Sequence, residues 1–184
     1  MIAIRKPGKD DYSDPKSYRP IALLSTVGKV LEGIIAARLS ELAETLNLLP
    51  ENHYGGRRGR STEMAIHAML ETIYAAWEKG MVASLLLMDV TGAYDHVSHD
   101  RLSSSSSHNL RKRRINVKYV TWILDCLRDR ATTLTVGFYT RERAPTATGI
   151  PQGSPMSLVL YIFYNVDLVE EIDEEPTNCF GMGT

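Results

Sequence analysis

The spacing of apolar residues changes along the chain, and this change most constrains the fold. In residues 27–46, 61–79, 118–129 and 155–172, apolar residues recur every three or four positions. That spacing places them on one face of an α-helix. Residues 82–90 instead form a short continuous apolar run, which favours a buried strand, with a piece of buried helix as the alternative that periodicity alone does not exclude. Helices that alternate with short strands predict an α+β (mixed α/β) fold.

The predicted helices have recognisable ends. Ser61 or Thr62 can cap the helix at 61–79 and Gly80 can end it, and Ser154 is the candidate N-cap of the last helix. Each predicted helix has one face that we expect to be buried. In the helix at 27–46 this face holds Val27, Val30, Leu31, Ile34, Ile35, Leu39, Leu42 and Leu46, and in the helix at 61–79 it holds Ile66, Met69, Leu70, Ile73 and Trp77. In the helix at 118–129 it holds Val120, Ile123, Leu124 and Leu127, and in the helix at 155–172 it holds Leu158, Tyr161, Ile162, Asn165, Leu168 and Ile172.

The remaining segments are shorter or less regular. Residues 1–20 carry three prolines and predict an irregular or hairpin segment. Short strands at about 132–136 and 144–148 are expected to pair as a hairpin. Five serines at 103–107 form a low-complexity insert without an apolar face, and the end of the chain is acidic.

Composition excludes several classes of protein. Of 184 residues, 43% are hydrophobic and 23% are charged, which excludes wholesale disorder. The net charge of −1 excludes a uniformly basic nucleic-acid coat but permits a local basic groove. Cys126 and Cys179 lack a paired spacing, so we expect neither a disulfide framework nor a zinc site. Without a signal-peptide pattern or a bilayer-length apolar run, we expect an intracellular protein that contacts no membrane.

Three segments carry candidate chemistry, and each has a simpler alternative. Asp89 follows the apolar run, where a carboxylate is suited to a divalent cation, although one Asp often only ends a strand in a turn. Gly149 and Gly153 flank Pro151-Gln152 before a helix, which favours anion binding or is a plain loop-to-helix connection. Basic side chains near residues 1–20, 57 and 111–114 can grip phosphates or simply face solvent.

Taken in order, these segments resemble a reverse transcriptase, most closely the RNA-directed DNA polymerases of non-LTR retrotransposons. The motifs that carry the resemblance are KPGK (6–9), YRPIALLSTVGKVLEGIIAARL (18–39), HYGGRRGRST (53–62), DVTGAYDHVSHDRL (89–102) and GIPQGSPMSLVLYIFYNVDL (149–168). They cover nearly the whole chain apart from the serine run and the C-terminal end. The resemblance implies a right-hand polymerase fold, with fingers and part of a palm whose incomplete sheet packs on helices.

The resemblance also assigns roles at the catalytic centre. Asp89 corresponds to the first catalytic aspartate of the palm, which binds two Mg²⁺ ions, and the Val90 backbone carbonyl helps hold one of them. Tyr94 corresponds to the aromatic residue under the incoming sugar, which excludes ribonucleotides. Two such ions, about 3.5–4 Å apart, stabilise the attacking and leaving oxygens of phosphoryl transfer.

The same resemblance assigns the substrate contacts. Lys6 and Arg19 correspond to finger residues that grip the triphosphate of the dNTP. Gln152 and Gly153 correspond to positions beside the incoming nucleotide and template. Arg57 and Arg60 correspond to residues that line the template path. The implied partners are an RNA template, a DNA primer and a dNTP.

The order of the motifs divides the chain. Residues 1–81 are expected to be fingers-like, 82–102 to hold the first palm motif, 103–117 to be a serine-rich and basic insert, and 118–184 to continue fingers and palm. No Asp-Asp pair follows Asp89, and no thumb is evident, so we expect a truncated domain that is inactive by itself. Two alternatives remain: a catalytically dead retroelement remnant and a maturase-like RNA-binding protein.

Overall fold

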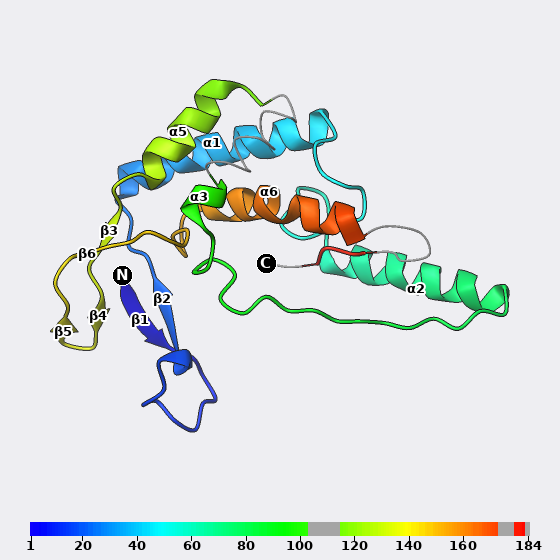
Figure 1. The fold of residues 1–184 in the computed structure, drawn as a ribbon, viewed down its shortest axis with the longest axis horizontal. Coiled ribbons are helices and arrows are strands. Elements are labelled where there is room, and N and C mark those ends of the chain that lie inside the picture. Colours follow the sequence, from blue (N-terminus) through cyan, green and yellow to red (C-terminus); the bar gives the residue numbers. More distant parts are fainter. Residues whose placement is uncertain (103–114, 173–178, 183–184) are drawn as a thin grey trace.

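The structure is a computed structural model that describes residues 1–102, 115–172 and 179–182 (Figure 1). Its helices are α1 (Thr26–Thr45), α2 (Thr62–Glu78), α3 (His99–Arg101), α5 (Val117–Leu127) and α6 (Pro155–Ile172), with a short 3₁₀ helix, η1 (Pro15–Ser17). Its strands are β1 (Ile2–Arg5), β2 (Tyr18–Ile21), β3 (Ala131–Thr132), β4 (Thr135–Val136), β5 (Tyr139–Thr140) and β6 (Ala144–Pro145). The predictions for the serine run, for basic residues 111–114 and for acidic residues 173–175 fall outside the described residues.

Helices α1, α5 and α6 pack together and form the main core (Figure 1). The predicted helix at 118–129 is confirmed as α5, whose Val120, Ile123 and Leu127 are buried as expected. Phe163 and Val166 of α6 are almost completely buried in the same core. Side-chain caps help set where these helices begin: Asn116 accepts a hydrogen bond at the start of α5, and Ser154 Oγ accepts one from Met156 N (3.1 Å) at the start of α6.

The strands form two small sheets at the end of the molecule that holds the N-terminus (Figure 1). A four-stranded sheet has the order β2-β1-β4-β5, in which β1 and β2 are antiparallel and Ile4 lies opposite Arg19. Of the two alternatives for residues 1–20, an irregular segment or a hairpin, the structure has the hairpin. The predicted pairing of 132–136 with 144–148 is correct only for β3 and β6, because β4 pairs with β1 and β5 instead.

The prediction of a buried strand at 82–90 is wrong. These residues are exposed and contain no strand; Val82, for example, is 92% exposed. None of the hydrogen bonds among the described residues involves their backbone. Figure 1 shows why: α2 extends away from the helical core, and the chain runs back alongside it as an extended segment without a neighbouring strand. A strand forms only where another backbone satisfies its N–H and C=O groups.

Helix positions follow the apolar spacing, but the buried faces differ from those predicted. In α1 the buried residues are Ile35, Ala36, Leu39 and Ala43, whereas Val27 is 80% exposed. In α2 only Ala65 is buried, and Trp77 of the predicted face is 59% exposed. The buried residues of α1 all lie from Ile35 onward, and the apolar residues of its first two turns stay exposed.

Candidate functional site

The loop at residues 149–153 connects three segments that are far apart in the sequence. Gly149 N donates to Val97 O (2.7 Å) and Ile150 N donates to Tyr94 O (2.8 Å). At its other end, Ala22 N, which follows β2, donates to Gln152 O (2.8 Å). The loop therefore joins the segment 94–97 to the strand that carries Arg19.

Backbone geometry at Gly149 explains why this junction requires glycine. Its φ is +83°, a conformation that other residues adopt only with strain. A Cβ atom there would lie 2.9 Å from the backbone oxygen of Asp95. The carbonyl of Gly149 also lies 2.7 Å from Nε2 of His99, so the start of the loop is held from both sides.

Tyr94, Gln152 and Gly153 lie around this junction. The Tyr94 ring packs on Tyr161 of α6, with 5.3 Å between ring centroids. The side-chain oxygen Oε1 of Gln152 is buried and accepts no hydrogen bond from the described residues. Gly153 is exposed, and a Cβ atom there would lie 3.3 Å from Ala22 O. A buried acceptor without a donor beside an exposed glycine is suited to a hydrogen bond from a bound ligand.

The two predicted triphosphate contacts lie on and beside the N-terminal hairpin. Arg19 is exposed on β2, three positions before Ala22. Lys6 follows β1, and its Nζ donates to the backbone oxygen of Lys16 (2.8 Å), which ties the ammonium to η1. Arg19 is thus available for an anion, and Lys6 keeps two further N–H donors while its ammonium is held beside η1.

Asp89 lies on the exposed segment 82–90, five positions before Tyr94. The described residues contain no group of three His, Cys, Asp or Glu side chains that could hold a metal ion. The described residues by themselves therefore do not fit a two-Mg²⁺ centre. The assignment of Asp89 and the Val90 carbonyl as metal ligands, and of Asp89 as the catalytic aspartate, stays a prediction.

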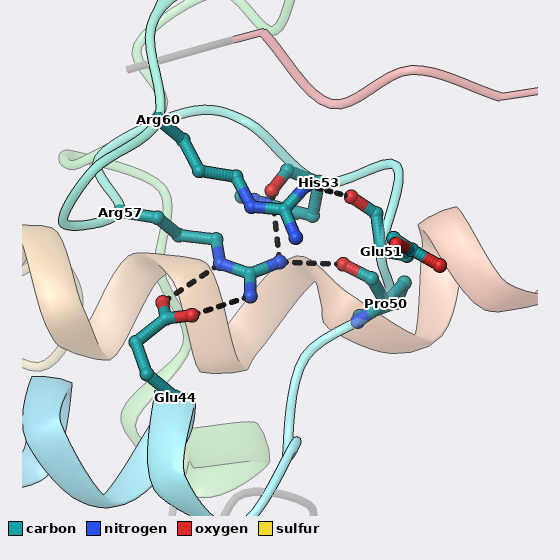
Figure 2. A network of polar contacts seen from close by, with 6 residues as sticks. All are labelled: Glu44, Pro50, Glu51, His53, Arg57 and Arg60. Carbon is teal, nitrogen blue, oxygen red and sulfur yellow. Dashed lines mark hydrogen bonds and ion pairs between the residues drawn. The ribbon is translucent and has the colours of Figure 1, made fainter.

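The loop between α1 and α2 contains a buried polar network around Arg57 (Figure 2). The guanidinium of Arg57 makes two hydrogen bonds to the Glu44 carboxylate, Nε to Oε1 at 2.9 Å and Nη2 to Oε2 at 2.7 Å. Its Nη1 donates to the backbone oxygens of Pro50 (2.6 Å) and His53 (3.0 Å). The Arg57 side chain is 4% exposed, so these contacts fix the loop to the last turn of α1.

Burial and the nearby arginines change the pKa values of two side chains in this network, Glu44 and His53. The hydrogen bonds from Arg57 lower the pKa of the Glu44 carboxyl below its ordinary value. Burial, and secondarily the charge of Arg57, lower the pKa of His53. The His53 ring is buried, and its Nδ1 has no hydrogen-bond partner among the described residues. His53 is therefore held in the neutral form.

Arg60 is also engaged within the same loop. Its Nη1 donates to the backbone oxygen of Glu51 (Figure 2). Its guanidinium also lies 5.2 Å from the centroid of the Tyr54 ring. The predicted template contacts of Arg57 and Arg60 stay predictions, since no nucleic acid is present.

Sequence reasoning missed two residues that organise these sites. Glu44 lies in an ordinary polar position of a helix, and no sequence signal marks it as the partner of Arg57, 13 positions away. His99 is close to the motif around Asp89, but its contact with Gly149 spans 50 positions. None of the described helices is long and apolar enough to cross a membrane.

Comparison with known proteins agrees with the motif order. Residues 4–181 match the family described as reverse transcriptase (RNA-dependent DNA polymerase). The chain is 34% identical, over 91% of its length, to the probable RNA-directed DNA polymerase from transposon BS of Drosophila melanogaster. It is 31% identical over 90% of its length to that from transposon X-element, and 29% identical over 95% to that from mobile element jockey, both of the same organism.

The chain spans less than a fifth of each of these three relatives: 18% of the first two and 19% of the third. The family match nevertheless extends across almost every described element, from β1 to the residues that follow α6. The chain belongs to the reverse transcriptase family, in the group of RNA-directed DNA polymerases of non-LTR retrotransposons.

Proposed function

We propose that this chain is the nucleotide-binding part of an RNA-directed DNA polymerase that copies an RNA template from a DNA primer inside the cell. In this proposal residues 1–81 form the fingers, 82–102 carry the first palm motif, 103–117 are an insert and 118–184 continue the fingers and palm. The family assignment and the motif order support this division.

The observation that carries the proposal is the junction at loop 149–153. Its hydrogen bonds join Tyr94, Gln152 and the strand of Arg19, which come from three separate motifs. A site for a nucleoside triphosphate needs a cation for the phosphates, a polar group near the base or sugar, and a flat surface for the sugar. Arg19, Gln152 and Tyr94 respectively have those properties.

Each residue has a distinct part in this site. Arg19, exposed on β2, offsets phosphate charge with a planar guanidinium that makes paired hydrogen bonds to oxygens. The buried amide oxygen of Gln152 accepts a hydrogen bond from the nucleotide. The Tyr94 ring is held by Tyr161 and limits the room beside the sugar, which favours deoxyribonucleotides by steric exclusion.

Titration of the chain with a fluorescent dATP analogue tests the proposal. We expect saturable binding that Arg19→Ala and Gln152→Ala each weaken by about tenfold, the effect of one lost charge-assisted or buried hydrogen bond. Both variants should keep the thermal unfolding midpoint of the parent chain within a few degrees.

Arg143→Ala is the matched control, because Arg143 is an exposed arginine between β5 and β6 and belongs to none of the segments that meet at the junction. It should leave nucleotide affinity unchanged. Absence of saturable dATP binding, or equal losses in Arg19→Ala and Arg143→Ala, would contradict a nucleotide site at loop 149–153.

A further inference from the structure

The arginines of the loop at 53–60 differ in what their side chains contact. Four of the five N–H groups of the Arg57 guanidinium are engaged, by Glu44, Pro50 and His53. Arg60 donates to Glu51 O and lies over the Tyr54 ring. Arg58 is exposed, and the described residues make no hydrogen bond or ion pair with its side chain.

Contacts on two sides fix the loop that carries Arg58. On one side Arg57 binds the carboxylate of Glu44 at the end of α1. On the other side Gly56 packs against α6 so closely that a Cβ atom there would lie 2.7 Å from Leu158 Cδ1. Arg58 lies between the buried Arg57 and Gly59, which has a φ of +73° and no atoms within 4 Å of a Cβ position. These neighbours therefore hold the Arg58 side chain toward solvent.

We propose that Arg57 is a positioning residue, and that Arg58 is the side chain of this loop that binds the phosphate backbone of a single-stranded template. The proposal rests on the nucleic-acid role of the proposed function and revises which arginine performs it. Burial and four engaged N–H groups close the Arg57 guanidinium to a phosphate, whereas the exposed Arg58 guanidinium keeps all five donors open to one.

Substitution by lysine separates positioning from phosphate binding, because it keeps the positive charge and removes the planar guanidinium with its parallel N–H donors. A lysine replaces an arginine adequately where only charge on a phosphate counts, but not where two parallel hydrogen bonds hold a carboxylate. We therefore expect Arg58→Lys to behave like the parent chain. Arg57→Lys should lower the thermal midpoint by roughly 10 °C and also weaken nucleic-acid binding, although the charge is kept.

The experiment measures binding of a fluorescein-labelled oligouridylate between about 50 and 200 mM salt, below the unfolding transition of every variant. Arg58→Ala should make the slope of log affinity against log salt shallower by about 0.7, the value for one phosphate contact on a single strand. Its thermal midpoint should equal that of the parent. In an Arg57→Lys background the Arg58→Ala change should be smaller, because the loop no longer holds Arg58 in place.

Glu44→Gln gives an independent variant if Arg57→Lys does not fold, since it weakens the same pair without altering any arginine. It should lower the thermal midpoint and reduce the Arg58→Ala effect in the same way. Arg57→Lys with parental stability and affinity would show that Arg57 acts as a charge on phosphate and would overturn the positioning role. Additive effects of Arg57→Lys and Arg58→Ala on oligouridylate affinity would overturn the positioning role too.

Failure of this proposal is distinguishable from failure of the nucleotide site. A parental slope in Arg58→Ala, or a parent chain that does not bind oligouridylate at low salt, would overturn the assignment of Arg58. Neither result changes the binding of dATP, which depends on Arg19 and Gln152 and not on the loop at 53–60.

Discussion

Single residues in the α1–α2 loop couple stability to pH. His53 is buried with a lowered pKa, and Glu44 has a pKa lowered by Arg57. In the unfolded chain His53 titrates near its ordinary pKa of about 6.5, so below that pH the unfolded state binds more protons than the folded state. The contribution of His53 to the free energy of unfolding is therefore fully present above about pH 6.5 and decreases as the pH falls. Glu44 contributes in the same direction at lower pH.

His53→Gln tests this coupling. The parent chain should lose a few degrees of thermal midpoint between about pH 7.5 and 5.5, and His53→Gln should lose clearly less because glutamine does not titrate. His67→Gln is the control, since His67 is exposed on α2, and it should keep the parental pH dependence. An unchanged pH dependence in His53→Gln would show that another group is responsible.

A second residue-scale prediction concerns Gly149. Gly149→Ala forces a Cβ atom toward the Asp95 backbone oxygen and also strains a φ of +83°. Gly137→Ala meets only the strain, because nothing lies within 4 Å of a Cβ atom there and its φ is +60°. We expect a loss of about 1 kcal/mol for Gly137→Ala and at least twice that for Gly149→Ala, measured by urea unfolding. Equal losses of unfolding free energy in the two variants would mean that the loop shifts enough to relieve the contact with the Asp95 backbone oxygen.

At the scale of elements, α2 and the segment 82–90 differ from the rest of the fold. Helix α2 buries only Ala65, and Leu85, Leu86, Leu87 and Met88 are all more than half exposed. An extended apolar segment with unpaired backbone groups readily pairs with another chain. We therefore expect this part of the molecule to govern self-association more than it governs stability.

Leu86→Lys tests that expectation. It should reduce aggregation in light scattering and leave the thermal midpoint nearly unchanged, because Leu86 is 79% exposed and contributes little to burial. Ala75→Lys adds the same charge at an exposed position of α2 and should reduce aggregation less. A large fall in thermal midpoint for Leu86→Lys would show that this segment is packed in solution.

For the whole molecule, the described residues bring together the motifs of the proposed nucleotide site but no metal centre. Asp89 is exposed, and the described residues contain no group of three His, Cys, Asp or Glu side chains that could hold a metal ion. Phosphoryl transfer depends on charge stabilisation at the reacting phosphate, which one isolated carboxylate does not provide.

We therefore expect residues 1–184 to show no primer extension above background on an RNA template, with either Mg²⁺ or Mn²⁺. Asp89→Ala should give the same background. Extension by the parent chain that Asp89→Ala abolishes would show that the chain assembles an active centre, and would contradict this prediction.

The sequence by itself determined the positions of α1, α2, α5 and α6 and the hairpin of β1 and β2. It also determined family membership, through motifs whose order is readable without coordinates. Helices form from contacts between residues that are close in sequence, and β1 pairs with the next strand along the chain, so these signals are comparatively local. Caps such as Ser61 at the start of α2 mark helix ends for the same reason.

Only the tertiary structure decided which faces are buried, that residues 82–90 form no strand, and that Arg57 is enclosed by Glu44 while Arg58 is exposed. Each of these depends on a partner from elsewhere in the chain. A strand needs a second backbone, a buried face needs a packing surface, and a buried guanidinium needs a carboxylate and carbonyls at the right distance. Apolar spacing and motif order carry no information about where those partners lie.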